Sequence, residues 1–277
     1  MKTKRKSSTA LITGATSGIG KSFAYKLAEK GYHLILVGRR ELELNSVAND
    51  LKETYKVHVD VMVGDLSLAK FRKSIAQKIK SNSSVDFLVN NAGFGIDHDF
   101  FQIKVKDLRS MVMTHDMATI ELTHAVLPGM LKRKKGRIIN VSSLGAFIPG
   151  FTRSLYLATK SFIHYFTKAL SIELKPHGIK VQSLCPGMTL TDFHDRDKTN
   201  AIKENSKFLN YMMPDKVAKI SLHSLENGKT ICIPGFINKI IVLIAKILPC
   251  KLLGFLSSFR RERPTIKYPH TLYALVA

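Results

Sequence analysis

Short apolar runs alternate with segments of helical periodicity along most of the chain. Short runs rich in Val, Ile and Leu predict strands. These runs cover residues 9–13, 33–37, 57–63, 85–89, 137–141, 179–184 and 230–233. Apolar residues that recur every three or four positions predict helices over 19–30, 42–55, 70–80, 106–134 and 155–174. The pattern therefore predicts a series of β-α-β units.

Such units predict a Rossmann-type, doubly wound α/β fold, with seven mostly parallel strands and helices on both faces of the sheet. No change in composition divides the chain, so we expect one catalytic domain over 1–235 and a C-terminal extension over 236–277. Lysines and a proline interrupt the apolar part of this extension, and its longest apolar run, 240–245, is far shorter than the roughly 20 residues of a membrane span. We expect an amphipathic helix there, serving as a substrate lid, a membrane-surface contact or an oligomer contact.

Composition and charge narrow the class of protein. The 277 residues include 43 Lys and Arg against 21 Asp and Glu, which gives a formal net charge of +22, and 45% are hydrophobic. The apolar content excludes an intrinsically disordered chain. The charge suits nucleic acid or anionic lipid, but the basic residues lie mostly on helical stretches without interleaved aromatics. We therefore expect no specific nucleic acid partner, and leave peripheral contact with an anionic membrane open.

Three scattered cysteines without a CxxC spacing argue against a disulfide scaffold and a metal site. They indicate a reducing compartment, and we expect a cytoplasmic protein that is either free or peripheral to a membrane.

A glycine-rich turn follows the first predicted strand and opens the first predicted helix. Its candidate cofactor-binding residues are Gly14, Thr16, Ser17, Gly18, Ile19 and Gly20. Glycine permits a tight turn and a close approach of the backbone to a bound group. The helix that follows presents free N–H groups to an anion. A dinucleotide pyrophosphate is the expected occupant, and a purely structural turn is the alternative.

The second predicted strand ends at Arg39 and Arg40. In a Rossmann unit this position faces the adenosine ribose, where an acid would select NAD and an arginine would pair with the 2′-phosphate of NADP. Because no acid occupies the strand end, we expect NADP, held by Arg39 with Arg40 nearby. The alternative is that both arginines are simply solvated.

Further candidates for cofactor binding follow the third and fourth predicted strands. Asp65 and Leu66 come after the third, where a carboxylate can accept from the adenine amino group. Asn91, Ala92 and Gly93 come after the fourth. The asparagine can tie the loop to neighbouring strands, and the glycine allows close approach to a ribose. Because the two groups of residues follow successive strands, each strengthens the assignment of the other to the cofactor site.

In their order and spacing these motifs resemble those of the classical short-chain dehydrogenase/reductase family. The matching segments are 13–20, 90–93, 156–160 and 186–187, and the resemblance covers roughly 8–235. It implies an NADP(H)-dependent oxidoreductase, and a homo-oligomer, dimer or tetramer, formed through two long helices at roughly 106–134 and 154–174.

Tyr156 and Lys160 support this chemistry on their own. They stand four apart on a predicted helix and so share a face. A free phenol has a pKa near 10. A neighbouring ammonium and a positive nicotinamide both favour the phenolate, which makes the phenol a usable general acid near neutral pH. The resemblance implies that the lysine also hydrogen-bonds the nicotinamide ribose.

Ser143 precedes Tyr156 by 13 residues. The resemblance implies that its hydroxyl holds the substrate oxygen, where it would stabilise the growing negative charge. Ser142 is the alternative.

A loop after the sixth predicted strand completes the expected cofactor site. The resemblance implies that Pro186 and Gly187 shape this loop against the nicotinamide and that Thr191 contacts the carboxamide. Thr189 is the rival of Thr191.

His115 departs from the family pattern. Many members carry an asparagine 13 residues before a proline that corresponds to Pro128, and that asparagine supports a water chain to the lysine. A histidine titrates near pH 6.5 and could hold a water as well, or it could crowd the site. We expect activity with an altered proton relay.

The function expected from these residues is NADPH-dependent reduction of a carbonyl, in lipid metabolism. The variable segments 94–101, 144–153 and 190–213 are rich in Phe, Tyr and Met, which suggests an apolar ketone or a 3-oxoacyl-type substrate. Two alternatives stay open. One is an NADP-linked alcohol dehydrogenase that runs in the oxidative direction, and the other is a weakly catalytic NADP-binding scaffold or sensor, which His115 favours.

Overall fold

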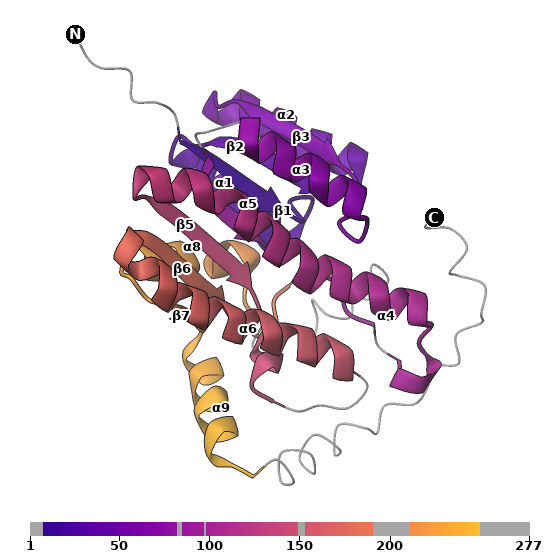
Figure 1. The fold of residues 1–277 in the computed structure, drawn as a ribbon. Coiled ribbons are helices and arrows are strands. Elements are labelled where there is room, and N and C mark those ends of the chain that lie inside the picture. The colour runs from indigo at the N-terminus through magenta and orange to yellow at the C-terminus, as the bar shows by residue number, and fades with distance from the viewer. Residues whose placement is uncertain (1–7, 82–84, 97, 149–152, 191–210, 250–277) are drawn as a thin grey trace.

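The computed structural model describes residues 8–81, 85–96, 98–148, 153–190 and 211–249. They form one parallel sheet of seven strands in the order β3-β2-β1-β4-β5-β6-β7 (Figure 1). The strands are β1 (Thr9–Thr13), β2 (His33–Gly38), β3 (Val59–Val63), β4 (Val85–Asn90), β5 (Gly136–Val141), β6 (Ile179–Leu184) and β7 (Ile231–Cys232). The strand order reverses between β1 and β4, and in open α/β sheets a ligand binds at this point, outside the carboxyl ends of the strands.

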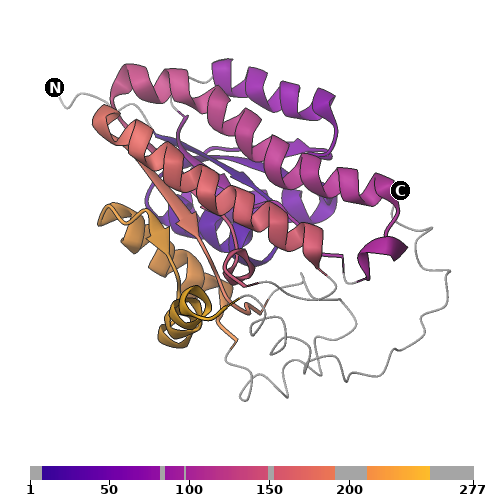
Figure 2. The same ribbon diagram turned by 60° about the horizontal axis from the view of Figure 1, so that its bottom comes forward.

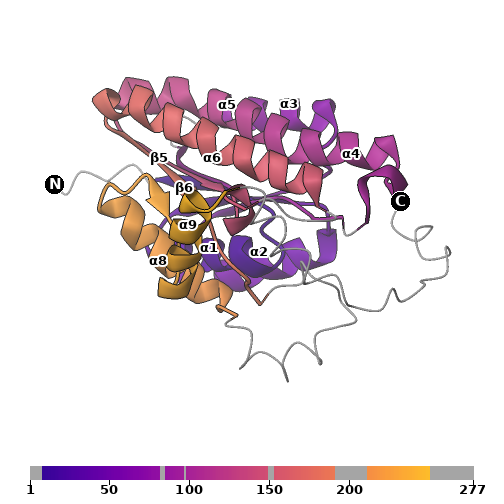
Figure 3. The same ribbon diagram turned by 90° about the horizontal axis from the view of Figure 1, so that it is seen from below.

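Helices cover both faces of this sheet (Figure 3). One layer contains α1 (Gly18–Glu29), α2 (Glu41–Tyr55) and α8 (Pro214–Glu226). The opposite layer contains α3 (Ala69–Ser81), α4 (Val105–Val112), α5 (Ala118–Arg133) and α6 (Ser154–Leu174). In this layer α5 and α6 run side by side (Figure 2). The doubly wound fold predicted from the sequence is confirmed, and every strand is parallel to its neighbours.

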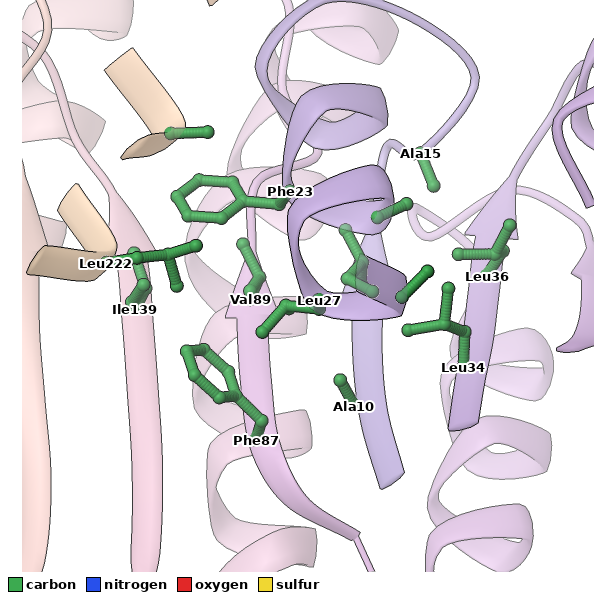
Figure 4. Packing of buried hydrophobic residues seen from close by; sticks show 14 of the residues in the cluster. Ala10, Ala15, Phe23, Leu27, Leu34, Leu36, Phe87, Val89, Ile139 and Leu222 are labelled. Carbon is green, nitrogen blue, oxygen red and sulfur yellow. The ribbon is translucent and has the colours of Figure 1, made fainter. Parts of the chain in front are cut away.

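Two apolar clusters lie on the two faces of the sheet, because alternate strand residues point to opposite sides. Ala10 and Ile12 of β1 pack into the cluster under α1, whereas Leu11 belongs to the cluster under α3 and α5. Figure 4 shows Phe23 and Leu27 of α1 lying over the first face, above the strands. Burial on both sides explains why the central strands β1, β2 and β4 are rich in apolar residues.

The structure corrects the predicted helix over 106–134. The segment is instead α4, a π-helical turn at Met113–Met117 and α5. A π turn holds one more residue than an α turn and so changes which side chains face inward. His115 and Asp116 lie within this turn and are buried, at 0% and 9% exposed. Helical periodicity cannot reveal such an insertion, because the segments on both sides remain helical.

Two further elements lie at the end of the described chain. Helix α8, whose bounds the periodicity did not predict, packs against α1, and helix α9 (Phe236–Ile247) follows β7. Among the described residues, no helix is both long and apolar enough to cross a bilayer.

Candidate active site

The glycine loop between β1 and α1 needs its glycines for steric reasons. Gly14 and Gly18 have positive φ angles of 67° and 54°, which side chains of L-residues rarely adopt. A β-carbon on Gly14 would lie 2.8 Å from Nδ2 of Asn91, and one on Gly20 would clash with the carbonyl oxygen of Gly14. The loop is therefore folded tightly against the strand ends, where a ligand can approach its backbone.

Asn91 joins this loop to the end of β4. Its Nδ2 donates to the carbonyl oxygens of Thr13 at 3.0 Å and Gly14 at 3.1 Å, and its backbone N–H donates to Oγ1 of Thr13 at 3.0 Å. The backbone N–H of Ala92 donates to the same hydroxyl at 3.0 Å. These bonds are the tie between loop and neighbouring strands that the sequence suggested for Asn91.

The start of α1 fits an anion such as a pyrophosphate. Ser17 precedes the helix and makes no side-chain capping hydrogen bond, so the first N–H groups of α1 have no cap from it. Nη2 of Arg40 donates to Oγ1 of Thr16 at 2.7 Å and to Oγ of Ser17 at 2.9 Å. A guanidinium therefore lies over the loop and adds positive charge to the helix N-terminus.

The two predicted phosphate-binding arginines differ in their surroundings. Arg40 is half-buried on the glycine loop and forms an ion pair with Glu43 at 3.6 Å, whereas Arg39 is exposed. The structure thus brings Arg40 to the loop and leaves Arg39 in solvent at the end of β2. Contact of either arginine with a 2′-phosphate stays a prediction.

The residues after β3 form a tight turn. Oδ1 of Asp65 accepts from the N–H of Ser67 at 2.8 Å. Leu66 is buried, and its carbonyl oxygen accepts from the guanidinium of Arg72 at 2.9 Å. The buried Arg72 also pairs with Glu121 of α5 at 3.0 Å. The sequence reading missed Arg72, since an arginine on an amphipathic helix ordinarily faces solvent.

The two candidate serines after β5 have different partners. Ser143 is hydrogen-bonded to Tyr156, and its Oγ accepts from the N–H of Gly145 at 3.0 Å. The hydroxyl of Ser142 is buried and donates to the carbonyl oxygen of Lys160 at 2.7 Å. Ser143 therefore stands beside the phenol, while Ser142 holds the backbone of α6.

Lys160 lies deep beside the phenol. Its side chain is 4% exposed, and its Nζ donates to the carbonyl oxygen of Val141 at 3.0 Å and lies 5.7 Å from the ring centroid of Tyr156. Burial lowers the pKa of Lys160 to about 8, although the nearby carboxyl of Asp116 opposes this shift. The amine can therefore exchange a proton close to neutral pH.

The pKa of Tyr156 is raised, because burial disfavours the phenolate. The hydrogen bond to Ser143 and the charge of Arg153 oppose this shift. The sequence reading assigned the opposing role to Lys160, whose ammonium is directed at Val141. A raised pKa keeps the phenol protonated at neutral pH, which is the form that a general acid needs.

His115 is held by hydrogen bonds at both ring nitrogens. Nε2 accepts from the N–H of Phe94 at 2.9 Å, and Nδ1 lies 2.9 Å from Oγ1 of Thr159. The Thr159 hydroxyl donates to the carbonyl oxygen of Tyr156 at 2.8 Å, so Nδ1 must carry the proton. Burial and the charge of Lys160 hold the pKa of His115 well below its usual range. The imidazole is thus neutral, with one tautomer.

Asp116 is a buried acid that the sequence reading did not single out. Burial raises the pKa of its carboxyl to about 7, and the charge of Lys160 opposes the shift. Its Oδ1 is buried and has no hydrogen-bond partner within the described chain. An acid inside a predicted amphipathic helix gives no signal of burial, because acidic residues on such helices ordinarily face solvent.

The loop after β6 lies against the same site. The carbonyl oxygen of Pro186 accepts from the N–H of Leu144 at 3.0 Å, and Oγ1 of Thr189 donates to the carbonyl oxygen of Gly187 at 3.1 Å. A β-carbon on Gly187 would lie 2.6 Å from the side chain of Asn238 at the start of α9. Thr191 lies outside the described residues, and Thr189 is buried.

Gly93 marks the place where these parts meet. A β-carbon there would lie 3.0 Å from Nε2 of His115 and 3.3 Å from Nζ of Lys160. The loop after β4 therefore lies beside the amine and is also bonded to the glycine loop through Asn91. A phenol, a hydroxyl and an amine thus stand at the carboxyl edge of the sheet beside a loop suited to a pyrophosphate, an arrangement able to move a proton next to a bound dinucleotide.

Known proteins resemble this chain in sequence and in fold. Residues 8–201 match the family model described as short chain dehydrogenase. A very-long-chain 3-oxoacyl-CoA reductase of Pyrenophora tritici-repentis is 36% identical over 203 residues, which are 72% of this chain and 60% of that protein. The mouse protein of the same name is 31% identical over 91% of this chain and 81% of its own length.

Two further proteins broaden the comparison. The human protein named inactive hydroxysteroid dehydrogenase-like protein 1 is 36% identical over 64% of this chain and 54% of its own length. Among solved structures, a short-chain dehydrogenase from Sphingobium yanoikuyae in complex with NADPH superposes with a TM-score of 0.78 at 25% identity, covering 95% of this chain and 99% of that one. The chain thus spans little more than half the length of some curated relatives and most of the length of others.

Proposed function

Because the chain belongs to the short-chain dehydrogenase family, we propose that it is an NADPH-dependent reductase of an apolar ketone or a 3-oxoacyl-type carbonyl. The glycine loop, the uncapped start of α1 and Arg40 support dinucleotide binding. The names of the Pyrenophora and mouse relatives support a 3-oxoacyl substrate, and the NADPH in the Sphingobium structure supports that cofactor. Membership in the family identifies the chemistry as oxidoreduction.

In the proposed mechanism, NADPH when bound supplies the hydride. Tyr156 donates its phenolic proton to the carbonyl oxygen, and the hydroxyl of Ser143 stabilises the negative charge that develops there. Lys160 stands next to the phenol and can return a proton to it after each turnover. Asn91 keeps the glycine loop in place relative to the catalytic residues.

One observation carries the proposal. Tyr156 is hydrogen-bonded to Ser143, and its ring centroid lies 5.7 Å from Nζ of Lys160, beside the loop that Asn91 joins to the glycine turn. Residues that are far apart in the chain lie together here. A tyrosine and a lysine that were only neighbours on an exposed helix face would not need such partners.

The experiment that tests this function is a screen of NADPH oxidation against aliphatic ketones, 3-oxoacyl thioesters and steroid-like ketones. We expect turnover of at least one apolar class, and a loss of about 10²- to 10⁴-fold in kcat for Tyr156→Phe with dinucleotide binding retained. Equal rates for the variant and the wild type would reject the assigned role of the phenol. Faster reaction of NADP with an alcohol would favour the oxidative alternative.

The scaffold or sensor alternative makes a different prediction. If the protein only binds NADP, calorimetry would show tight binding of the dinucleotide while every carbonyl and alcohol in the screen stays unreacted. His115 and the similarity to a relative named inactive favour this alternative. The presence of the Ser143, Tyr156 and Lys160 set favours catalysis.

We also infer a homo-oligomer formed through α5 and α6. The outer face of α6 exposes Phe162, Tyr165 and Ile172, which form an apolar strip along the helix. Exposed apolar residues of this kind often mark an interface between subunits. Light scattering should give a mass of at least two chains, and Ile172→Glu should lower it.

The last part of the proposal is peripheral contact with an anionic membrane through α9. This helix buries Val242 and Ala245 against the protein but exposes larger apolar residues, with Phe236 77% and Ile247 73% exposed. A surface helix ordinarily shows the opposite distribution. Twelve residues cannot span a bilayer, but an apolar outer face can lie in the interface while the +22 charge attracts anionic lipid. The cytoplasmic location expected from the sequence stays a prediction.

A further inference from the structure

Thr159 stands between the two catalytic residues of α6, and the mechanism above gives it no role. It follows Tyr156 by three residues, directly precedes Lys160 and is 2% exposed. Its hydroxyl donates to the carbonyl oxygen of Tyr156 at 2.8 Å, so its oxygen is left as the acceptor of the 2.9 Å bond from Nδ1 of His115. A buried hydroxyl that both donates and accepts is held in one orientation.

The imidazole of His115 links this hydroxyl to the loop after β4. Its Nε2 accepts from the backbone N–H of Phe94 at 2.9 Å, which leaves Nδ1 as the protonated nitrogen of a neutral ring. The ring lies edge-on to the rings of Phe94 and Tyr156, with centroids 5.6 and 6.0 Å away. An unbroken chain of hydrogen bonds therefore runs from the loop after β4 to the helix turn that carries the phenol.

This arrangement bears on the role of the histidine. The imidazole of His115 is fully buried, and both of its nitrogens have protein partners. A water held by the ring would have to displace either the N–H of Phe94 or the hydroxyl of Thr159, and a buried polar group that loses its partner is costly. The geometry therefore favours a bridge between two segments over a proton relay through the ring.

The bridge reaches α6 from a different side than the other hydrogen bonds to this part of the helix. Ser142 donates to the carbonyl oxygen of Lys160 at 2.7 Å, and the hydroxyl of Ser161 donates to the carbonyl oxygen of Ala146 at 3.1 Å. Both of these bonds join α6 to the segment after β5. The bond from His115 joins the same helix to the loop after β4, so it constrains a direction that the other two leave open.

We propose that His115 and Thr159 form a positioning pair, which fixes the helix turn that carries Tyr156 relative to the loop at Gly93. Asn91 joins this loop to the glycine turn, where the dinucleotide is expected. The pair thereby sets the place of the phenol relative to the bound cofactor, where a displacement of about 1 Å can lower the rate about 10²-fold. The effect on turnover rests on the proposed reductase function, whereas the hydrogen-bonded bridge does not.

The first test is spectroscopic and needs neither cofactor nor substrate. Protein with ¹⁵N in its histidine rings is examined by NMR at neutral pH, and the signal of His115 is assigned by its absence from His115→Asn. We expect the tautomer protonated at Nδ1, with a ring proton that moves upfield and exchanges faster in Thr159→Val but not in Thr159→Ser. A ring protonated at Nε2, or a ring proton unaffected by Thr159→Val, would overturn the pair.

Kinetics provide the second test. Thr159→Val removes the hydroxyl with little change of shape, and kcat should fall about 10²-fold while NADPH binds with an unchanged Kd. Thr159→Ser keeps the hydroxyl and should recover most of this loss. Thr159→Ala serves in place of the valine variant if the latter does not fold. Wild-type kcat in both variants that lack the hydroxyl would overturn the positioning role.

The same helix supplies a matched control. Thr167 is 0% exposed, donates to the carbonyl oxygen of Ile163 at 2.6 Å and accepts from Nδ2 of Asn140 at 3.0 Å. It is bonded in the same manner as Thr159 but lies eight residues further along α6. Thr167→Val should therefore lower stability without lowering kcat, and an equal loss of kcat in this variant would make the effect at Thr159 merely structural.

A double-mutant cycle tests the pairing itself. The loss caused by Thr159→Val is measured in the wild type and in His115→Asn, and we expect a much smaller loss in the second background because the bridge is already broken there. Equal losses in both backgrounds would overturn the pair. If no carbonyl is turned over by the wild type, the reductase function fails, and the NMR measurement still decides whether the bridge exists.

Discussion

Nδ1 of His115 donates a 2.9 Å hydrogen bond to Oγ1 of Thr159, whose own hydroxyl donates to the carbonyl oxygen of Tyr156. The chain of donors runs from the π turn into the first turns of α6, the helix that carries the phenol and the amine. Because these hydrogen bonds suit a neutral imidazole, a histidine can occupy this position without a charge. The same bonds fix the orientation of the imidazole relative to α6.

His115 should make the protein sensitive to acid. Its pKa in the folded state is depressed, so on acidification the unfolded chain takes up a proton first, below pH 6.5. Stability is therefore full above pH 6.5 and is lost as the pH falls, by up to about 1.4 kcal/mol per pH unit for one histidine. Burial also lowers the pKa of His164, to about 4, so this residue contributes to the same loss of stability at acidic pH.

The measurement is denaturant unfolding at several pH values from neutral to mildly acidic. His115→Asn should reduce the slope of the unfolding free energy against pH by up to the equivalent of one proton. His223→Asn, at an exposed position of α8, should leave this slope unchanged. Equal slopes for His115→Asn and wild type would show that the imidazole is protonated in the folded state. An unchanged pH–rate curve in the same variant would remove the relay role expected for His115.

Ser143→Ala and Ser142→Ala should fail in different ways. Loss of the Ser143 hydroxyl removes a donor to the developing oxyanion, and we expect kcat to fall about 10²- to 10³-fold with little change in stability. Loss of the Ser142 hydroxyl removes a buried hydrogen bond to the carbonyl of Lys160, an interior residue of α6, which should cost about 1 kcal/mol of stability. Kinetics combined with thermal unfolding distinguish the two serines, and the reverse result would make Ser142 the catalytic one.

Arg39 and Arg40 should together determine the choice of cofactor. Replacing either with alanine should weaken NADPH binding more than NADH binding, because only NADPH carries the 2′-phosphate. We expect the larger effect at Arg40, which also supports the glycine loop through Thr16 and Ser17. Calorimetry with both dinucleotides decides this, and a preference for NADH in the wild type would contradict the assignment.

Gly20→Ala and Gly129→Ala test the geometry of the loop. A β-carbon on Gly20 meets the carbonyl of Gly14 and the amide of Asn91, so the loop must open and dinucleotide binding should be lost. A β-carbon on Gly129 in α5 would lie 3.1 Å from Nη1 of Arg133, whose guanidinium also donates to the carbonyl oxygen of Val85 at 2.6 Å. Gly129 lies away from the glycine loop, so Gly129→Ala should leave dinucleotide binding unchanged and change stability by about 1 kcal/mol or less. Retained binding in Gly20→Ala would show that the pyrophosphate does not use this turn.

The outer face of α9 should bind anionic vesicles. Full-length protein should co-sediment with vesicles of phosphatidylcholine containing phosphatidylserine, and less with phosphatidylcholine alone, because the charge of +22 contributes. Leu243→Glu with Ile247→Glu should abolish binding, whereas Leu42→Glu, an exposed position on α2, should not. Absence of co-sedimentation in the wild type would reject the membrane contact.

The linear pattern of residues was enough to determine the class of fold and the order of its parts. Strands buried on both faces are rich in apolar residues, so β1 and β4 can be recognised in the sequence as short apolar runs. The short segments that follow parallel strands must gather at one edge of the sheet. Gly14, Asn91, Tyr156 and Lys160 could be found in this way, because their roles depend on local spacing and on strand order.

Tertiary structure alone decided the charge state and the partners of the buried groups. Nothing in the spacing of residues shows that the segment around His115 forms a π turn, or that Arg72 pairs with Glu121 inside the protein. Nor does it show that Oδ1 of Asp116 is buried without a hydrogen-bond partner among the described residues. Burial and pairing depend on which elements pack together across the sheet. Since a pKa is shifted by desolvation and by charges a few ångströms away, it follows from that packing and not from the order of residues in the chain.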